Sequence, residues 1–178
     1  MYVLGAVCFG VDPASTMLRR AMSSYSVSVT RPFVRGRDPQ RHLLRRDGTD
    51  WCVDALDVLV HAGQQVSLGQ TLIRRYAPAA LAGSSRRARS PSPQEAAPSK
   101  AVFDIYRSNN AKARYCTDSG VSRCGNMVLE LGEAEVSGTS SRSLVELRVS
   151  VGGDVLRLCA VDSVSGRSAR TTVDFASQ

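Results

Sequence analysis

The stretch VLRLCAVDSVSGRSARTTVDF (residues 155–175) decides the fold class of this chain. On both sides of a turn segment at residues 162–166, most apolar residues alternate with polar ones, as in half-buried strands. Gly166 can adopt the positive φ that a tight hairpin turn requires. Alternation continues upstream through residues 144–151, and a second turn follows at residues 152–154. The sequence therefore predicts a three-stranded antiparallel meander.

Shorter predicted elements lie upstream of the meander. Strands are expected at residues 25–29, 70–76, 101–106 and 127–131. Within residues 43–60, a short helix is expected, because its apolar residues could share one helix face: Trp51, Val53, Leu56, Leu59 and Val60. Residues 77–100 are nearly all Ala, Ser, Pro, Gly and Arg, and their only large apolar residue is Leu81, which predicts a disordered loop. The fold class is therefore mainly β.

Composition narrows the setting of the protein. The 178 residues carry a formal net charge of +7, which permits acidic partners but does not determine a fold. No run of about 18 apolar residues predicts a membrane span. The apolar start of the chain has no basic region ahead of it, which argues against a secretory signal. The cysteines are odd in number and scattered, which favours reduced thiols and a cytoplasmic location: Cys8, Cys52, Cys116, Cys124 and Cys159.

A search for catalytic and metal-binding patterns finds none. The two histidines, His42 and His61, have polar neighbours and no nucleophile elbow beside them, so both are expected to be surface residues. The spacing between Cys116 and Cys124 matches no common zinc module, and no phosphate-binding loop occurs. We therefore expect no catalytic residue, metal site or cofactor on this chain.

A basic run at residues 31–46 holds six arginines against one carboxylate, Asp38. Phosphate contacts suit such charges, but base stacking would need more aromatic residues than Phe33 alone, which argues against nucleic acid. The run is interpreted as a solvated or partner-facing loop, with Arg31, Arg35 and Arg37 as its candidate contacts. In the predicted disordered loop, Ser90 precedes a proline and follows arginines, which makes it a candidate phosphorylation site.

The final hairpin resembles the last strands of the β-sandwich substrate domain of the 70-kDa heat-shock chaperones, where the run xLxVxAxDxxxGxxxxxxI is typical. Further blocks resemble the divergent heat shock 70 kDa protein 12 branch, whose members carry FGLDP, DGxxWCxDxFD and ITDPGVxxCG. The corresponding blocks here are FGVDP (residues 9–13), DGTDWCVDALD (residues 47–57) and CTDSGVSRCG (residues 116–125). The chain is thereby identified as a C-terminal fragment of a member of that branch.

This resemblance implies a domain organisation. Residues 1–22 would be a remnant of the last helix of an actin-like ATPase domain and its connector, and residues 23–76 the first part of the sandwich, with the short helix inserted. The disordered loop at 77–100 and the second part of the sandwich at 101–175 would follow. The ATPase motifs of the family would lie upstream, so ATP and magnesium belong to the full-length family. We therefore expect no enzymatic activity on this chain.

The resemblance also implies a chaperone function in the stress response, in which a groove between two loops of the sandwich binds an extended polypeptide. Carried over singly, Val29 and Pro32 would lie on the first groove loop, Ile73 on the opposing strand, and Ala101 and Phe103 at the floor of the pocket. In a second interpretation, Val29, Ile73 and Phe103 simply fill the core. Arg31 and Arg35 beside the groove would favour acidic or mixed clients.

A different class of function also fits the residues. The basic run and the predicted disordered loop could make the protein a non-chaperone adaptor or scaffold that binds protein partners or acidic surfaces. Strong salt dependence of binding would favour this alternative, because exposed charges are screened by salt. Binding of apolar segments that is insensitive to salt would favour the chaperone interpretation.

Overall fold

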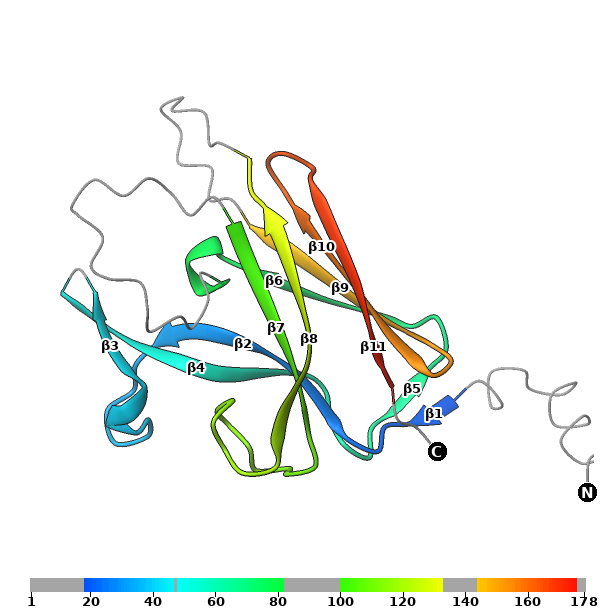
Figure 1. The fold of residues 1–178 in the computed structure, drawn as a ribbon, viewed down its shortest axis with the longest axis horizontal. Helices are drawn as coiled ribbons and strands as arrows, with labels where there is room; N and C mark the ends of the chain where they lie inside the picture. The colour runs from blue at the N-terminus through cyan, green and yellow to red at the C-terminus, as the bar shows by residue number, and fades with distance from the viewer. Residues whose placement is uncertain (1–17, 47, 82–99, 133–143, 176–178) are drawn as a thin grey trace, which may run out of the picture.

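The computed structural model describes residues 18–46, 48–81, 100–132 and 144–175, and most of these residues lie in strands. Two antiparallel sheets pack against each other (Figure 1), and a separate ribbon of β1 (Leu18–Arg20) and β5 (Gln65–Ser67) lies at one end. The five-stranded sheet consists, in spatial order, of β3 (Leu43–Arg46), β4 (Thr49–Val60), β2 (Ser24–Pro32), β7 (Lys100–Ser108) and β8 (Val121–Glu130). The four-stranded sheet consists of β11 (Ser168–Asp174), β10 (Val155–Asp162), β9 (Val145–Gly152) and β6 (Thr71–Tyr76). The predicted mainly β sandwich is confirmed.

The predicted meander is formed by β9, β10 and β11. Leu158 in the central strand pairs with Val149 on one side and Thr171 on the other. The two turns contain Gly153 and Gly166 at φ values of 70° and 69°, where a side chain would be strained. Alternation of apolar and polar residues therefore predicted this sheet correctly.

The main core lies between the two sheets. Leu147, Leu156 and Leu158 from the meander meet Tyr25 and Phe103 from the five-stranded sheet, and all five are fully buried. The Tyr25 hydroxyl donates a hydrogen bond to the backbone oxygen of Asp174 at 3.0 Å, so burial leaves this polar group satisfied. Apolar burial of this kind is the main favourable contribution to folding.

The short helix expected within residues 43–60 is wrong, because β4 spans most of this segment. A register irregularity separates the two parts of the β2–β4 pairing, and Asp54 in this region has a φ of 61°. Such bulges interrupt the two-residue alternation. The segment from Cys52 to Ala55 is buried on consecutive positions, so both strand faces are covered there. The apolar spacing consequently resembles that of a helix.

Two other expectations need revision at their boundaries. Disorder over the whole of residues 77–100 is wrong at its start, because Pro78–Leu81 forms the 3-10 helix η2, and Leu81 is buried in the main core. Residues 82–99 lie outside the described residues. Residues 18–20, assigned to the connector, form β1, while the expected helical remnant at 1–17 lies outside the described residues.

Candidate functional site

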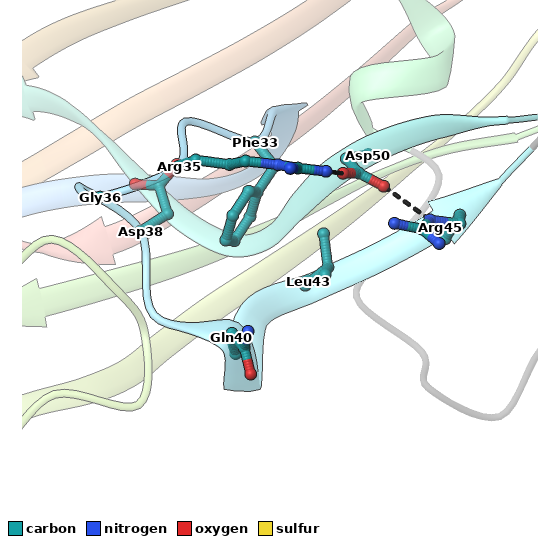
Figure 2. Close-up of a pocket in the computed structure, with 8 residues that line it drawn as sticks. All are labelled: Phe33, Arg35, Gly36, Asp38, Gln40, Leu43, Arg45 and Asp50. Atoms are coloured by element: carbon teal, nitrogen blue, oxygen red, sulfur yellow. Dashed lines mark hydrogen bonds and ion pairs between the residues drawn. The ribbon is translucent and has the colours of Figure 1, made fainter.

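The connection between β2 and β3 folds over one face of the β3–β4 hairpin, and a pocket open to solvent lies between them. After Pro32, the backbone N–H of Phe33 donates to the carbonyl of Asp50 at 3.0 Å, and the chain turns at Gly36, whose φ is 80°. The 3-10 helix η1 (Gln40–His42) then leads into β3. The pocket has a volume of about 360 Å³ and is lined by Phe33, Arg35, Gly36, Asp38, Gln40, Leu43, Arg45 and Asp50 (Figure 2).

Two arginines share one carboxylate at the rim of this pocket. Arg45 Nε lies 2.8 Å from Asp50 Oδ1, and an Arg35 guanidinium nitrogen lies 3.3 Å from Asp50 Oδ2. Hydrogen bonds from Arg45 and then Arg35 lower the pKa of Asp50. The Arg35 and Arg45 side chains are 82% and 67% exposed. The rim therefore has more positive than negative charge, and the excess is open to solvent.

Asp38 holds the wall of the pocket in place through buried hydrogen bonds. Its carboxylate accepts two hydrogen bonds of 2.7 Å from Arg31, one of 2.9 Å from the backbone N–H of Val34, and one of 2.8 Å from the Tyr115 hydroxyl. The Asp38 side chain is fully buried, and the hydrogen bonds from Arg31 keep its pKa well below the usual range. Asp38 thus joins β2, the β2–β3 connection and the segment between β7 and β8.

His42 is fully buried in the same region, so its prediction as a surface residue is wrong. Its ring stacks on Tyr115 with centroids 4.3 Å apart, and its Nε2 accepts a hydrogen bond from Arg41 Nε at 3.1 Å. Its Nδ1 lies 3.6 Å from a carboxylate oxygen of Asp54. Polar neighbours in the sequence suggested exposure, but the Tyr115 ring that covers His42 comes from a distant segment. His61 is exposed.

The β3 strand lies at the edge of its sheet and carries apolar residues on the face opposite the pocket. Within the described part of the chain, β3 pairs only with β4, so its outer side has no strand partner. Pro32, Trp51 and Leu44 pair in sequence across β2, β4 and β3 and form an apolar row. Leu44 is 41% exposed. This edge thus has the exposed Leu44 on one face and the charged pocket on the other, where Leu43 and Arg45 lie (Figure 2).

The structure distributes the five predicted peptide-binding residues over different surroundings. Ala101 and Phe103 are fully buried in the main core, which agrees with the interpretation that Phe103 fills the core. Val29 is half-buried where the main core meets a smaller cluster of Cys52, Ala55 and Tyr115. Pro32 is exposed in the apolar row opposite the pocket, and Ile73 is 48% exposed on β6 in the other sheet. Their binding role stays a prediction.

The three predicted partner-facing arginines differ in exposure. Arg31 is 26% exposed and bound to Asp38, whereas Arg35 and Arg37 are mostly exposed. Ser90 lies outside the described residues. Sequence reasoning missed Leu44, Trp51 and Tyr115 at this site. The alternation of Leu44 and Arg45 could have indicated a short strand with an apolar and a charged face. No pattern in the sequence indicated the tertiary contacts of Tyr115.

Two cysteines, Cys52 and Cys116, lie among the buried residues at this end of the sheet. Burial raises the pKa of the Cys116 thiol to about 11 and also raises the pKa of Cys52, so neither is a reactive thiolate at neutral pH. Among the described residues, no group of three His, Cys, Asp or Glu side chains could hold a metal ion. The two carboxylates that line the pocket, Asp38 and Asp50, are bonded to arginines and are not free to hold magnesium.

No helix in the described parts of the chain is long and apolar enough to cross a membrane. A scan against protein-family models finds no match. Among curated proteins, the chain is 32% identical to human and mouse heat shock 70 kDa protein 12A over 96% of its length. It is 34% identical to human heat shock 70 kDa protein 12B over 97% of its length. The chain spans about a quarter of the length of these relatives. Nearly all of this chain is therefore similar to about a quarter of the length of the heat shock 70 kDa protein 12 proteins.

Proposed function

We propose that this chain binds extended polypeptide segments by adding them as a strand to the edge of β3, as the binding portion of a chaperone-type protein. The observation that carries this proposal is the outer edge of β3, which no other strand of the described residues pairs with and which lies between the exposed Leu44 and the pocket. Unpaired strand edges offer N–H and C=O groups that bind another chain, and neighbouring pockets provide specificity.

The geometry of a strand explains how both faces would contribute. Successive side chains of an added strand point to opposite faces, as those of β3 do. On one face, apolar client residues would pack on Leu44 and towards Trp51, with a gain of about 25 cal/mol per Å² buried. On the other face, client residues would meet Leu43 and Phe33 in the pocket.

The charge at the pocket rim supports a preference for clients that combine apolar and acidic residues. Arg35 and Arg45 share the single carboxylate of Asp50, so a client carboxylate beside Arg45 would complete the charge balance. Arginine favours such partners because its planar guanidinium binds carboxylates with two hydrogen bonds. Arg31, in contrast, is already occupied by both oxygens of Asp38. The acidic preference therefore belongs to Arg35 and Arg45.

Trp51, the single tryptophan of the chain, provides an intrinsic probe of this edge. We would titrate the protein with a short peptide in which Leu alternates with Glu, and follow both Trp51 emission and the anisotropy of a labelled copy. We expect saturable binding with a change in Trp51 emission. Leu44→Asp should weaken this binding about ten-fold, because it places a charge where a client side chain must pack.

The matched control is Val128→Asp in β8, the opposite edge strand of the same sheet. Val128 is 45% exposed, close to the 41% of Leu44, so both changes place a carboxylate on a similarly exposed edge position. We expect Val128→Asp to leave binding unchanged. Equal losses in both variants, or no binding by the parent protein, would contradict the proposal. Binding that disappears wholly at high salt would favour the adaptor alternative.

A further inference from the structure

The outer face of the four-stranded sheet carries a group of arginines that the proposed peptide edge does not use. Across this face, Ile73, Arg148, Cys159 and Arg170 lie side by side on β6, β9, β10 and β11. In the next row, Arg157 lies between Ser150 and Thr172. Neighbouring strands are about 4.8 Å apart, and outward positions on one strand about 7 Å apart, so a single extended segment could contact these arginines in turn.

The outer face of the four-stranded sheet carries more positive than negative charge. Four arginines, Arg75, Arg148, Arg157 and Arg170, point outward from the described strands, against two carboxylates, Glu146 and Asp174. Glu146 binds both Arg75, at 3.2 Å, and Arg148, at 2.8 Å. Arg157 and Arg170 are exposed, and the recorded ion pairs of the described residues include neither of them. The excess positive charge is therefore concentrated on β10 and β11.

We propose that this face is a second interaction surface, which binds an acidic polypeptide segment through Arg148, Arg157 and Arg170. Arg148 and Arg170 flank the half-buried Cys159 in one row, and the guanidinium of Arg157 lies over Gly152, so the basic surface is extended along the strands and has few long neutral side chains to obstruct a ligand. Carboxylates suit arginine because both partners are planar and bind through paired hydrogen bonds. The Ser150 and Thr172 hydroxyls beside Arg157 offer further hydrogen bonds to such a segment.

The composition of this face favours an acidic polypeptide over nucleic acid or a membrane. None of the outward positions on β6, β9, β10 and β11, all of them described, holds an aromatic residue on which a base could stack. Glu146 and Asp174 lie among the arginines and would repel a continuous phosphate backbone. Only Ile73 is a strongly exposed large apolar residue there, which is little for insertion into lipid. A segment with separated carboxylates can avoid both acidic residues.

The test uses labelled oligo-glutamate as the probe, with the double variant Arg157→Gln/Arg170→Gln. We expect this variant to weaken binding by about five-fold to ten-fold, because two exposed charge pairs are lost. The control is Arg20→Gln/Arg107→Gln, which removes the same net charge from exposed positions on β1 and β7. Binding of oligo-glutamate by this control should weaken by less than about two-fold, since the change alters only the overall electrostatic field of the protein. Arg157→Gln/Arg170→Gln should retain the change in Trp51 emission on titration with the alternating Leu and Glu peptide, which separates this surface from the proposed peptide edge.

Several results would overturn the inference. Equal losses in the two double variants would mean that oligo-glutamate responds only to net charge. Tighter binding of duplex DNA or of phosphatidylserine vesicles than of oligo-glutamate, lost in Arg157→Gln/Arg170→Gln, would assign the face to a different ligand class. Absence of oligo-glutamate binding at low salt would also contradict it. Circular dichroism of each variant would confirm that the β-sheet is retained.

Discussion

Between the two sheets, Phe103, Leu147 and Leu158 are buried among other apolar side chains, whereas at the β3 end of the five-stranded sheet Asp38 and His42 are buried beside Tyr115. We refer to the first region as the sandwich body and to the second as the polar end. The body is stabilised by the removal of apolar surface from water, which needs shape but little direction. The polar end depends on directed hydrogen bonds, because a buried group without its partner is costly.

This difference indicates how the molecule combines stability with binding. The body can support both sheets without presenting any specific chemistry to solvent. The polar end keeps the pocket and the β3 edge in place, although it contains only a small apolar cluster of Cys52, Ala55 and Tyr115. A change in the body should therefore weaken the whole fold, while a change in the polar end should loosen the binding site first.

The largest effect is expected for Phe103→Ala in the sandwich body. Phe103 is fully buried, and truncation of a buried phenylalanine costs about 3–5 kcal/mol through lost burial and the cavity left behind. Denaturant unfolding followed by Trp51 fluorescence and by circular dichroism should show both transitions shifting together. The control is Val102→Ala at the half-buried neighbouring position, which should lower the free energy of unfolding much less. Similar losses in the two variants would contradict the role of Phe103 in the body.

A smaller and more local effect is expected for Asp38→Asn in the polar end. The new amide can still accept a hydrogen bond from the Val34 N–H, but it offers Arg31 only an N–H donor or a neutral oxygen. We therefore expect the free energy of unfolding to fall by about 2–3 kcal/mol. Because Trp51 lies near this end, its fluorescence transition should precede the loss of circular dichroism. The matched change Asp50→Asn, at the exposed rim, should leave the two transitions together. Coincident transitions in Asp38→Asn would show that the polar end does not unfold separately.

The contrast between the two regions also explains what the sequence could predict. The meander was predictable because its alternation is local and uninterrupted, and the inward residues of β9, β10 and β11 follow it. The polar end was not predictable, because Asp38 and Tyr115 are 77 residues apart and neither shows a periodic pattern. The bulge near Asp54 also interrupts the alternation of β4, so this strand was predicted as a short helix. Of the predicted site residues, Arg35 lines the pocket, and Pro32 lies on the opposite face of the same sheet edge.

The effect of pH provides a third test, since Asp162, where β10 enters its turn to β11, is a buried carboxylate outside the polar end. Burial alone would raise the pKa of Asp162, but hydrogen bonds from Ser165, Val164 and Gly132 lower it to about 2. A carboxyl with a lowered pKa stabilises the fold above its unfolded pKa of about 4 and loses that contribution as pH falls towards 2. Relative to Asp162→Asn, the parent should be more stable at about pH 6 by on the order of 2 kcal/mol.

This advantage over Asp162→Asn should shrink in denaturant titrations at about pH 4 and about pH 3, because Asp162 in the unfolded chain then takes up a proton that the folded chain does not yet bind. A constant difference between the two proteins across this range would mean that the hydrogen-bond geometry, and not the charge of Asp162, is what matters. Such a result would leave the sandwich body stabilised by neutral contacts alone and would strengthen its contrast with the polar end.

The smallest effect is expected for Glu130→Gln, which removes an ion pair from the same sheet that carries Asp38. Glu130 lies 3.6 Å from Lys100, and the two side chains are 68% and 57% exposed. Exposed pairs gain little because water and salt screen them, so the free energy of unfolding should change by less than about 0.5 kcal/mol. The Arg31–Asp38 pair has the same kinds of charge but a fully buried carboxylate. If Glu130→Gln cost as much as Asp38→Asn in parallel denaturant titrations, burial would not explain the stability of the polar end.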